Sequence, residues 1–236
     1  ANVAAVIADA TGAIALGDAS ITITGDITAA NATSLAALTD GVVTATASDS
    51  AANLAGMTIG ASDVISMTVT AGAVTAANLN TANGLGAGVL NASAATSITG
   101  TASALATLKA AVDAGEVTIA ANVAVTISDT PTLTQLATID AMTTGAVSYT
   151  SVSGAIADLL SSAYVTGSVN VTVTGGATRA DVSSLDALTT GTLTYSLTET
   201  VTNLVDNSVS DLDGQAVTVS NTVTAAQLVS IDTNNG

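Results

Sequence analysis

The chain has 236 residues, of which 48% are hydrophobic, and its 18 acidic and 2 basic side chains give a formal net charge of −16 at pH 7. This charge excludes nucleic acid as a partner, because Lys109 and Arg179 alone cannot neutralise a row of phosphates. The absence of Cys and His removes thiolate chemistry, zinc–thiolate sites and the usual general base.

Short helices are predicted along the whole chain. Each expected start is a Ser or Thr followed three residues later by a polar or small residue, which is typical of a helix N-cap. Apolar residues then recur at every third position and predict two to three turns with one buried stripe. Gly145 and Gly191 are expected to end their helices in the left-handed conformation. In chain order the starts are Thr28, Ser50, Thr75, Thr101, Thr132, Ala155 (a degenerate one), Thr178, Thr200 and Thr224.

Short strands that alternate aliphatic with hydroxyl side chains are predicted between these helices. Polar residues interrupt every apolar run well before the ~18 residues of a membrane span, so no membrane insertion is expected. The strands are expected to begin near Ile21, Val43, Ile65, Val89, Val125, Val147, Val171, Leu193 and Val217.

One phrase recurs at a fixed distance. "ATIDAMTTGAVSYT" at 137–150 returns as "SSLDALTTGTLTYS" at 183–196, and "VSIDTNNG" repeats its middle once more. Asp140, Asp186 and Asp232 are therefore equally spaced (186 − 140 = 46; 232 − 186 = 46). Each 46-residue repeat divides into two similar coils of roughly 22–25 residues, and an insertion at about 101–125 lengthens one of them.

These patterns predict an α/β repeat fold, a single elongated solenoid over residues 1–236. It is expected to be a right-handed parallel β-solenoid with one strand and one short helix per coil, leucine-rich-repeat-like in shape. The alternative is a β-helix without regular helices. Because "ANVAAVIADATG" has neither a basic region nor an initiating Met, the chain is expected to be a segment of a longer repeat polypeptide.

The phrases "ADVSSLDALTTGTLTYS" and "GSVNVTVTGGA" resemble the Ala/Thr/Val/Asp-rich tandem repeats of very large bacterial surface proteins. Such proteins are familiar from cyanobacteria and proteobacteria, and many are exported by type I secretion. The resemblance implies an extracellular or cell-surface location and a structural or adhesive role, as a surface fibre, surface layer or adhesin stalk. Because a solenoid exposes strand edges at open ends, the expected partner is the chain itself, through end-to-end stacking or adjoining repeats.

The recurring Asp140, Asp186 and Asp232 lie near the C-terminal ends of predicted helices, where the helix dipole disfavours a carboxylate. The favoured interpretation is a structural acceptor for backbone N–H groups of the adjacent turn. The alternative is a calcium ligand, because hard oxygen ligands suit that ion. Asp211 and Asp213 in "SDLDGQ" have the spacing of a short calcium loop but lack its further ligands. No other cofactor is expected.

Two other features of the sequence bear on function. Outward threonines form a column that β-propensity explains, or that offers a flat hydroxyl array to ice or another ordered surface, although irregular coil lengths disfavour the second. Catalysis is not expected, because no His can complete a Ser–His–Asp triad. A polysaccharide-active enzyme is the remote alternative, with Glu116 and Glu199 as the available glutamates. The column comprises Thr22/Thr24, Thr44/Thr46, Thr68/Thr70 and Thr172/Thr174.

Overall fold

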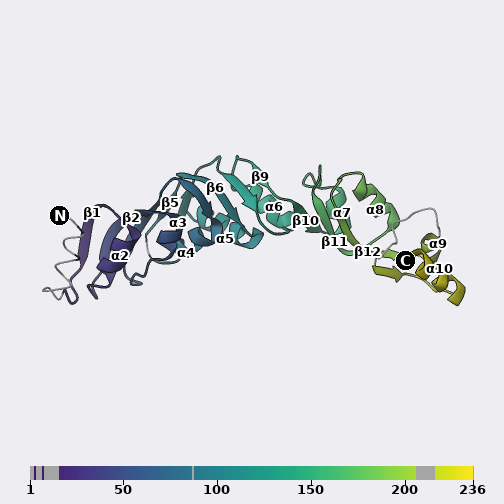
Figure 1. Cartoon of the computed structure of the whole chain (residues 1–236), viewed down its shortest axis with the longest axis horizontal. Helices are drawn as coiled ribbons and strands as arrows, with labels where there is room; N and C mark the ends of the chain where they lie inside the picture. Colours follow the sequence, from purple (N-terminus) through teal and green to yellow (C-terminus); the bar gives the residue numbers. More distant parts are fainter. Residues whose placement is uncertain (1–2, 4–6, 8–15, 87, 206–215, 236) are drawn as a thin grey trace. The chain divides into compact units, whose positions relative to one another are not determined.

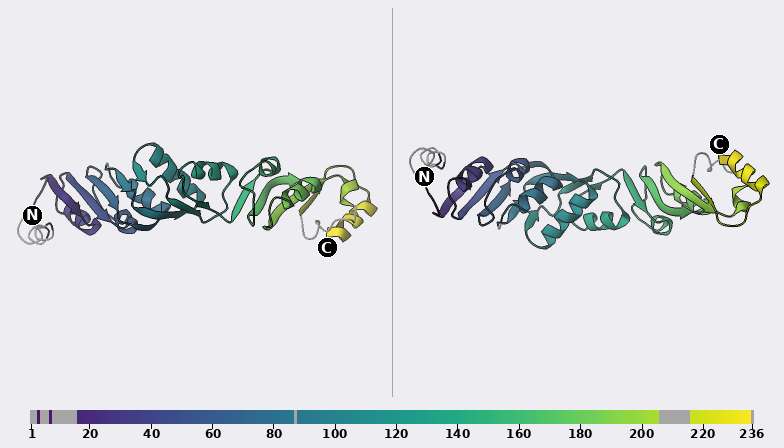
Figure 2. Two further views of the ribbon diagram at one scale, coloured as in Figure 1. Left: turned by 90° about the horizontal axis from the view of Figure 1, so that it is seen from above. Right: turned by 90° about the horizontal axis from the view of Figure 1, so that it is seen from below.

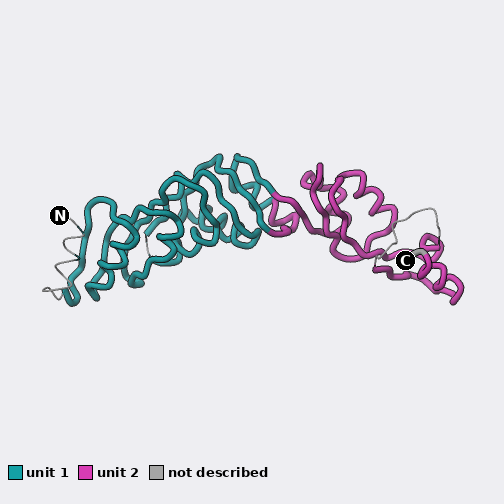
Figure 3. Tube along the Cα trace, viewed as in Figure 1, with its two compact units in different colours: residues 1–128, 137–148 teal, residues 129–136, 149–236 magenta. Residues whose placement is uncertain are grey.

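The computed structural model describes residues 3, 7, 16–86, 88–205 and 216–235. The chain divides into two compact units: unit 1 comprises residues 1–128 and 137–148, and unit 2 comprises residues 129–136 and 149–236 (Figure 3). The boundary runs through a helix and through the recurring phrase, so the repeat pattern of the sequence does not reveal it.

Strands and helices alternate along the chain (Figure 1), and the pairings between described strands are all parallel. This α/β arrangement agrees with the predicted fold class, and the alternative of a β-helix without regular helices is wrong. The helices are α2 (Ala29–Ala36), α3 (Ala51–Ala55), α4 (Ala76–Asn83), α5 (Ala102–Asp113), α6 (Leu133–Asp140), α7 (Ile156–Leu160), α8 (Arg179–Asp186), α9 (Val201–Leu204) and α10 (Ala225–Asn235).

The described strands form three sheets, two in unit 1 and one in unit 2. Within each sheet the strands lie side by side in the order in which they occur in the sequence, as the colours in Figure 2 also show within each unit. The first sheet has the order β1 (Ile21–Ile27), β2 (Val43–Asp49), β3 (Val64–Val69), β5 (Leu90–Ala92), β7 (Val117–Ile119). The second has the order β4 (Gly72–Thr75), β6 (Ala95–Gly100), β8 (Ala124–Ile127), β9 (Val147–Ser148). The sheet of unit 2 has the order β10 (Ser151–Gly154), β11 (Asn170–Ala177), β12 (Leu193–Glu199), β13 (Ala216–Val219).

Every predicted strand start lies within one residue of a described strand, but β4, β6, β7 and β10 were not predicted. Between residues 64 and 154 two short strands precede each helix, so the prediction of one strand per coil does not hold there. The strands β1 and β11 are continuous, but their pairing register shifts next to Gly25 and Gly175, which have φ angles of +97° and +91°. The chain bends at this point, and between residues 64 and 154 the corresponding strand region is divided into two short strands. We call a strand region, the helix after it and the turn to the next strand one repeat.

The predicted N-caps are confirmed, since each predicted start immediately precedes a described helix. At Thr178 both halves of a capping box are present: its Oγ1 accepts the Asp181 amide and its own amide donates to the Asp181 carboxylate, each at 3.2 Å. Two starts cap without a side-chain hydrogen bond, Ala155 and Thr200. The other capping bonds are donated by the amides of Asn31, Asn53, Asn78, Ala104, Gln135 and Gln227.

The core consists of aliphatic layers. Each helix from α2 to α9 carries a leucine that is 0% exposed, and burial of one such side chain stabilises the fold by about 1.5–3 kcal/mol. These leucines face inward strand residues such as Val43, Ile65 and Val125, which are also 0% exposed. The leucines are Leu35, Leu54, Leu79, Leu105, Leu136, Leu159, Leu185 and Leu204.

The predicted left-handed conformation of Gly145 and Gly191 is wrong, because neither is among the glycines with positive φ. Both are needed for a different reason. A Cβ at either position would lie within 3.0 Å of the backbone of the preceding repeat, closer than real Cβ atoms approach heavy atoms. Gly41 and Gly88 stand in the same relation to their preceding repeats. The turns before β2, β5, β9 and β12 therefore stack backbone against backbone.

We expect Gly88→Ala to lower the free energy of unfolding by about 2 kcal/mol, because its Cβ would overlap the Ile65 backbone. Gly84→Ala is the matched control, since a Cβ there meets Thr81 and Asn80 oxygens at ordinary distances of 3.5 and 3.6 Å. Gly84→Ala should leave stability within about 1 kcal/mol of the original. Urea denaturation of both variants tests this, and equal stabilities would contradict backbone stacking at Gly88.

Candidate functional site

Three threonines occupy equivalent positions in three turns. Each of them joins its own turn to the turn of the repeat before it. The Oγ1 of Thr189, which is 4% exposed, donates to the Val169 carbonyl oxygen at 2.6 Å and accepts the Gly191 amide at 3.0 Å. One hydroxyl thus satisfies a carbonyl and an amide of two stacked turns. The same bonds recur at Thr143 (Val123 oxygen 2.6 Å, Gly145 amide 2.9 Å) and at Thr39 (Ala19 oxygen 2.5 Å, Gly41 amide 2.9 Å).

Sequence reasoning missed these threonines, although they stand inside the recurring phrase. The signal is the four-residue string of an aliphatic or Met, a Thr, any residue and a Gly, as in "MTTG" at 142–145 and "LTTG" at 188–191. The Gly allows the close approach of the turns and the Thr bonds across it.

At one junction between repeats a carboxylate accepts a backbone amide that a carbonyl oxygen binds elsewhere. Asp63, 3% exposed, accepts the Val43 amide at 2.8 Å and the Gly60 amide at 2.7 Å. At the start of β8 the corresponding amide, that of Val125, donates instead to the backbone oxygen of Ala146 at 2.9 Å. The Asp63 carboxylate therefore replaces a carbonyl oxygen of the parallel ladder.

Side chains of one repeat also bind the first helical amide of the repeat before it. The acceptor is always 20 residues further along the chain, at the end of the neighbouring strand or just after it. Such amides lack a partner within their own helix, and the side-chain oxygen satisfies them. The bonds run from Ala29 to Asp49 (3.2 Å), from Arg179 to Glu199 (3.4 Å) and from Val201 to Asn221 (2.8 Å).

Glu199 and Asp49 are held ionised by these contacts. Burial opposes the charge of Glu199, which is 7% exposed, but the Thr200 amide, the Asn203 side chain and the Arg179 amide and guanidinium outweigh it, so its pKa is lowered. The Asn53 side-chain amide, at 2.7 Å from Asp49, is the main reason that the pKa of Asp49 is lowered, with burial opposing. Both carboxylates act as structural acceptors.

The three recurring aspartates are not among these buried or half-buried acceptors. Asp140, Asp186 and Asp232 are exposed at or near the ends of α6, α8 and α10. Other carboxylates, those of Asp49, Asp63 and Glu199, accept backbone amides of the preceding repeat.

The calcium candidates Asp211 and Asp213 lie outside the described residues. Within the described ranges no group of three or more acidic side chains is placed to hold a metal ion. The carboxylates of Asp49, Asp63 and Glu199 instead accept hydrogen bonds from backbone amides.

The two glutamates considered for glycan cleavage lie in different units and are each bound by amides. Glu116 accepts the Asn83 side-chain amide at 3.0 Å, and Glu199 has the donors given above. None of the described helices is long and apolar enough to cross a membrane. The chain matches no family model, no curated protein and no solved structure.

We expect Thr189→Val to lower the free energy of unfolding by about 1–3 kcal/mol, because it keeps the side-chain shape but leaves the Val169 oxygen and Gly191 amide without their partner. Thr194→Val, on the exposed face of β12, is the control and should change stability by less than about 0.5 kcal/mol. Thermal or urea unfolding measures both. A Thr189 variant as stable as the Thr194 variant would refute the cross-turn bond.

The lowered pKa of Glu199 leads us to expect a loss of stability in acid. A carboxyl whose folded-state pKa is lowered binds more protons when unfolded, so it stabilises the fold above its unfolded pKa and loses this as the pH falls through the folded pKa. The free energy of unfolding should therefore fall as the pH drops below about 4.5, the ordinary pKa of a glutamate. In Glu199→Gln we expect lower stability at pH 7 and a shallower fall.

Asp186→Asn is the control for Glu199→Gln, because Asp186 is exposed and is expected to tolerate the amide. Urea denaturation at several pH values between 7 and 3 would give both profiles. If Glu199→Gln kept the original slope, the amide-bound carboxylate would not be a source of the pH dependence.

Proposed function

We propose that the chain is a structural repeat module of an extracellular assembly, a right-handed parallel β-solenoid that acts as a surface fibre, surface-layer or adhesin-stalk segment. The observation that carries the proposal is the recurrence of one kind of contact. At several junctions in both units, threonine, carboxylate and asparagine side chains join neighbouring repeats at a sequence separation of 20 residues. Contacts restricted to neighbouring repeats are the property that distinguishes a stacked array from a globule.

The composition supports the same role. A net charge of −16 and two basic residues favour a chain that stays hydrated at high ionic strength, and the described acidic groups either face solvent or cap backbone amides. The resemblance of "ADVSSLDALTTGTLTYS" to repeats of very large bacterial surface proteins favours an extracellular location. No catalytic role is proposed.

Pulling the 236-residue chain between its ends tests the proposal. A solenoid should unwind in successive steps of about one coil, and roughly 23 residues at 3.3–3.6 Å each correspond to roughly 75–85 Å of added contour length. Single-molecule force measurements resolve such steps. Release of the chain in one or two large steps would contradict a stacked array and favour globular units.

Binding of ice or another ordered surface is the second candidate, and the strand register favours it. Exposed hydroxyl side chains at Thr75, Thr99, Thr126 and Ser148 are paired successively across β4, β6, β8 and β9, at about 4.8 Å per strand. The long helix α5 lies between β6 and β8 without disturbing this register, so irregular repeat length does not break the array.

Thermal hysteresis in the presence of ice would identify this second function. Hysteresis lost in Thr99→Lys and retained in Thr107→Lys, which changes an exposed threonine of α5, would place it on the hydroxyl array. The polysaccharide-active enzyme remains the remote alternative, and turnover of a glycan that is lost on replacing Glu199 would favour it.

A further inference from the structure

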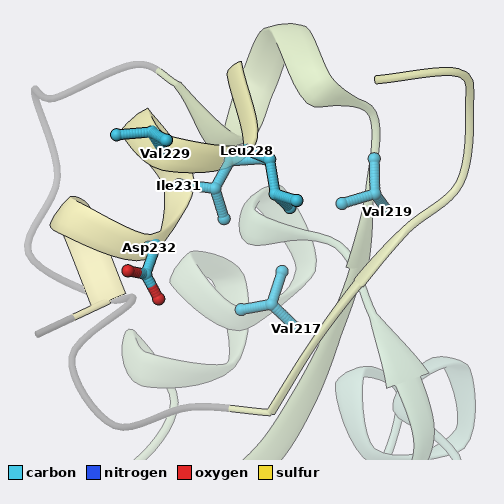
Figure 4. Close-up of a pocket in the computed structure, with 6 residues that line it drawn as sticks. All are labelled: Val217, Val219, Leu228, Val229, Ile231 and Asp232. Carbon is cyan, nitrogen blue, oxygen red and sulfur yellow. The ribbon is translucent and has the colours of Figure 1, made fainter. Parts of the chain in front are cut away.

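A groove lined mainly by aliphatic side chains lies between β13 and α10 in unit 2. Its volume is about 470 Å³, and it is lined by Val217 and Val219 of the strand and by Leu228, Val229, Ile231 and Asp232 of the helix (Figure 4). Leu228 and Val229 are 54% and 65% exposed, among the most exposed large apolar side chains of the described residues. The close-up shows Val217, Val219 and Leu228 directed toward the same space.

The equivalent residues 46 positions earlier in the chain show how such a groove is filled. Val182 stands in α8 where Leu228 stands in α10 (228 − 182 = 46), and it is only 5% exposed. Val171 and Val173 of β11 are 1% and 7% exposed. In that 46-residue repeat β11 pairs with the next strand, β12, whereas the described part of the chain holds no strand beyond β13.

The first residues of α2, α9 and α10 show the same contrast. Ala29 and Val201, which begin α2 and α9, are 3% and 5% exposed, and each amide is bound by a side chain of the next repeat. Ala225, which begins α10, is exposed. The groove and this helix start therefore form one face, shaped to receive a strand with inward aliphatic side chains.

The strand β1 presents the matching edge. In the described part of the chain β1 is paired only with β2, and its inward residues Ile21 and Ile23 are half-buried. The inward residues of β2 at the same level, Val43 and Ala45, are 0% and 6% exposed because β1 and β3 flank them. Two faces thus expose the aliphatic layers that stacking buries elsewhere.

We infer that the groove between β13 and α10 binds the β1 edge of a second copy of this chain, with β1 pairing parallel to β13 and Ile21 and Ile23 entering the groove. The inference rests on the proposed structural function and names the surfaces that it uses. Such a head-to-tail contact joins two different faces and extends into a filament unless it closes into a ring. Because each copy carries a net charge of −16, salt should strengthen the contact by screening repulsion.

Sedimentation velocity and light scattering of the 236-residue protein across a salt series test the contact. The weight-average mass should rise several-fold above the 22.4 kDa of one copy at high salt. Leu228→Asp should remain at the mass of one copy, because the equivalent Val182 is buried by stacking, and its circular dichroism should stay unchanged, because Leu228 is already 54% exposed. Val89→Asp, which alters a 59% exposed valine outside both faces, should assemble like the original.

A mixing experiment separates this contact from a groove-to-groove dimer. A Leu228→Asp copy keeps its β1 edge, so a small amount should occupy the growing end of filaments and shorten them. In a groove-to-groove dimer the variant would join nothing and leave the original unaffected, which would overturn the proposal. A protein that stays at one-copy mass at every salt concentration would also overturn it, and would indicate that the chain covers its own groove.

The failure of this inference and the failure of the proposed function are distinguishable. A protein that stays at one-copy mass yet unwinds in steps of single coils would remain a repeat module whose groove takes no second copy. A protein that assembles but is released in one large step would not be a stacked array.

Discussion

The structure depends on satisfying backbone hydrogen-bonding groups across the junction between one repeat and the next. A buried amide or carbonyl without a partner costs about 1–3 kcal/mol, and the turns before β2, β5, β9 and β12 approach too closely for side chains to intervene. Thr143 and Thr189 meet this constraint with a single hydroxyl that serves an acceptor and a donor. Asp63 meets it with a carboxylate in place of a backbone oxygen.

The same constraint accounts for the composition. Layers that repeat along a stack have the same small volume to fill, so Leu, Ile, Val and Ala suffice and Phe and Trp are absent. Threonine serves twice, as a β-branched residue on the strands and as a bonded hydroxyl in the turns. The acidic side chains that cap helices, Asp49 and Glu199, remain charged because amide groups donate hydrogen bonds to them. The proposed role as a structural module uses these properties and requires no cofactor.

Local patterns allowed much of the fold to be predicted. The N-caps and the first residues of strands such as β1 and β12 depend on contacts within a few residues, and these were located within one residue. The extra strands β4 and β10 were missed because a bend, set by pairing with distant strands, divides what appears as one apolar run. The division into two units was also missed, since it reflects packing between segments rather than a change in composition.

The candidate site was harder to predict than the fold. Recurrence drew attention to Asp186, which is exposed, and away from Thr189 in the same phrase, which bonds across the turn. Recurrence shows that a position matters to every repeat, but it does not distinguish a solvent-facing polar residue from one that bonds to the neighbouring repeat. Asp63 does not recur at all, because it replaces a carbonyl oxygen at one junction only, so no sequence pattern identifies it.

Hydrogen exchange of the Val43 amide in an Asp63→Ala variant tests most directly whether side chains of one repeat satisfy the backbone of the repeat before it. Val125 is the internal reference, because its amide bonds to the Ala146 backbone oxygen within the same unit. Protection at Val43 should fall at least about tenfold more than at Val125, since only Val43 loses its acceptor. Protection at Val43 that is unchanged, or that falls only as much as at Val125, would contradict this expectation.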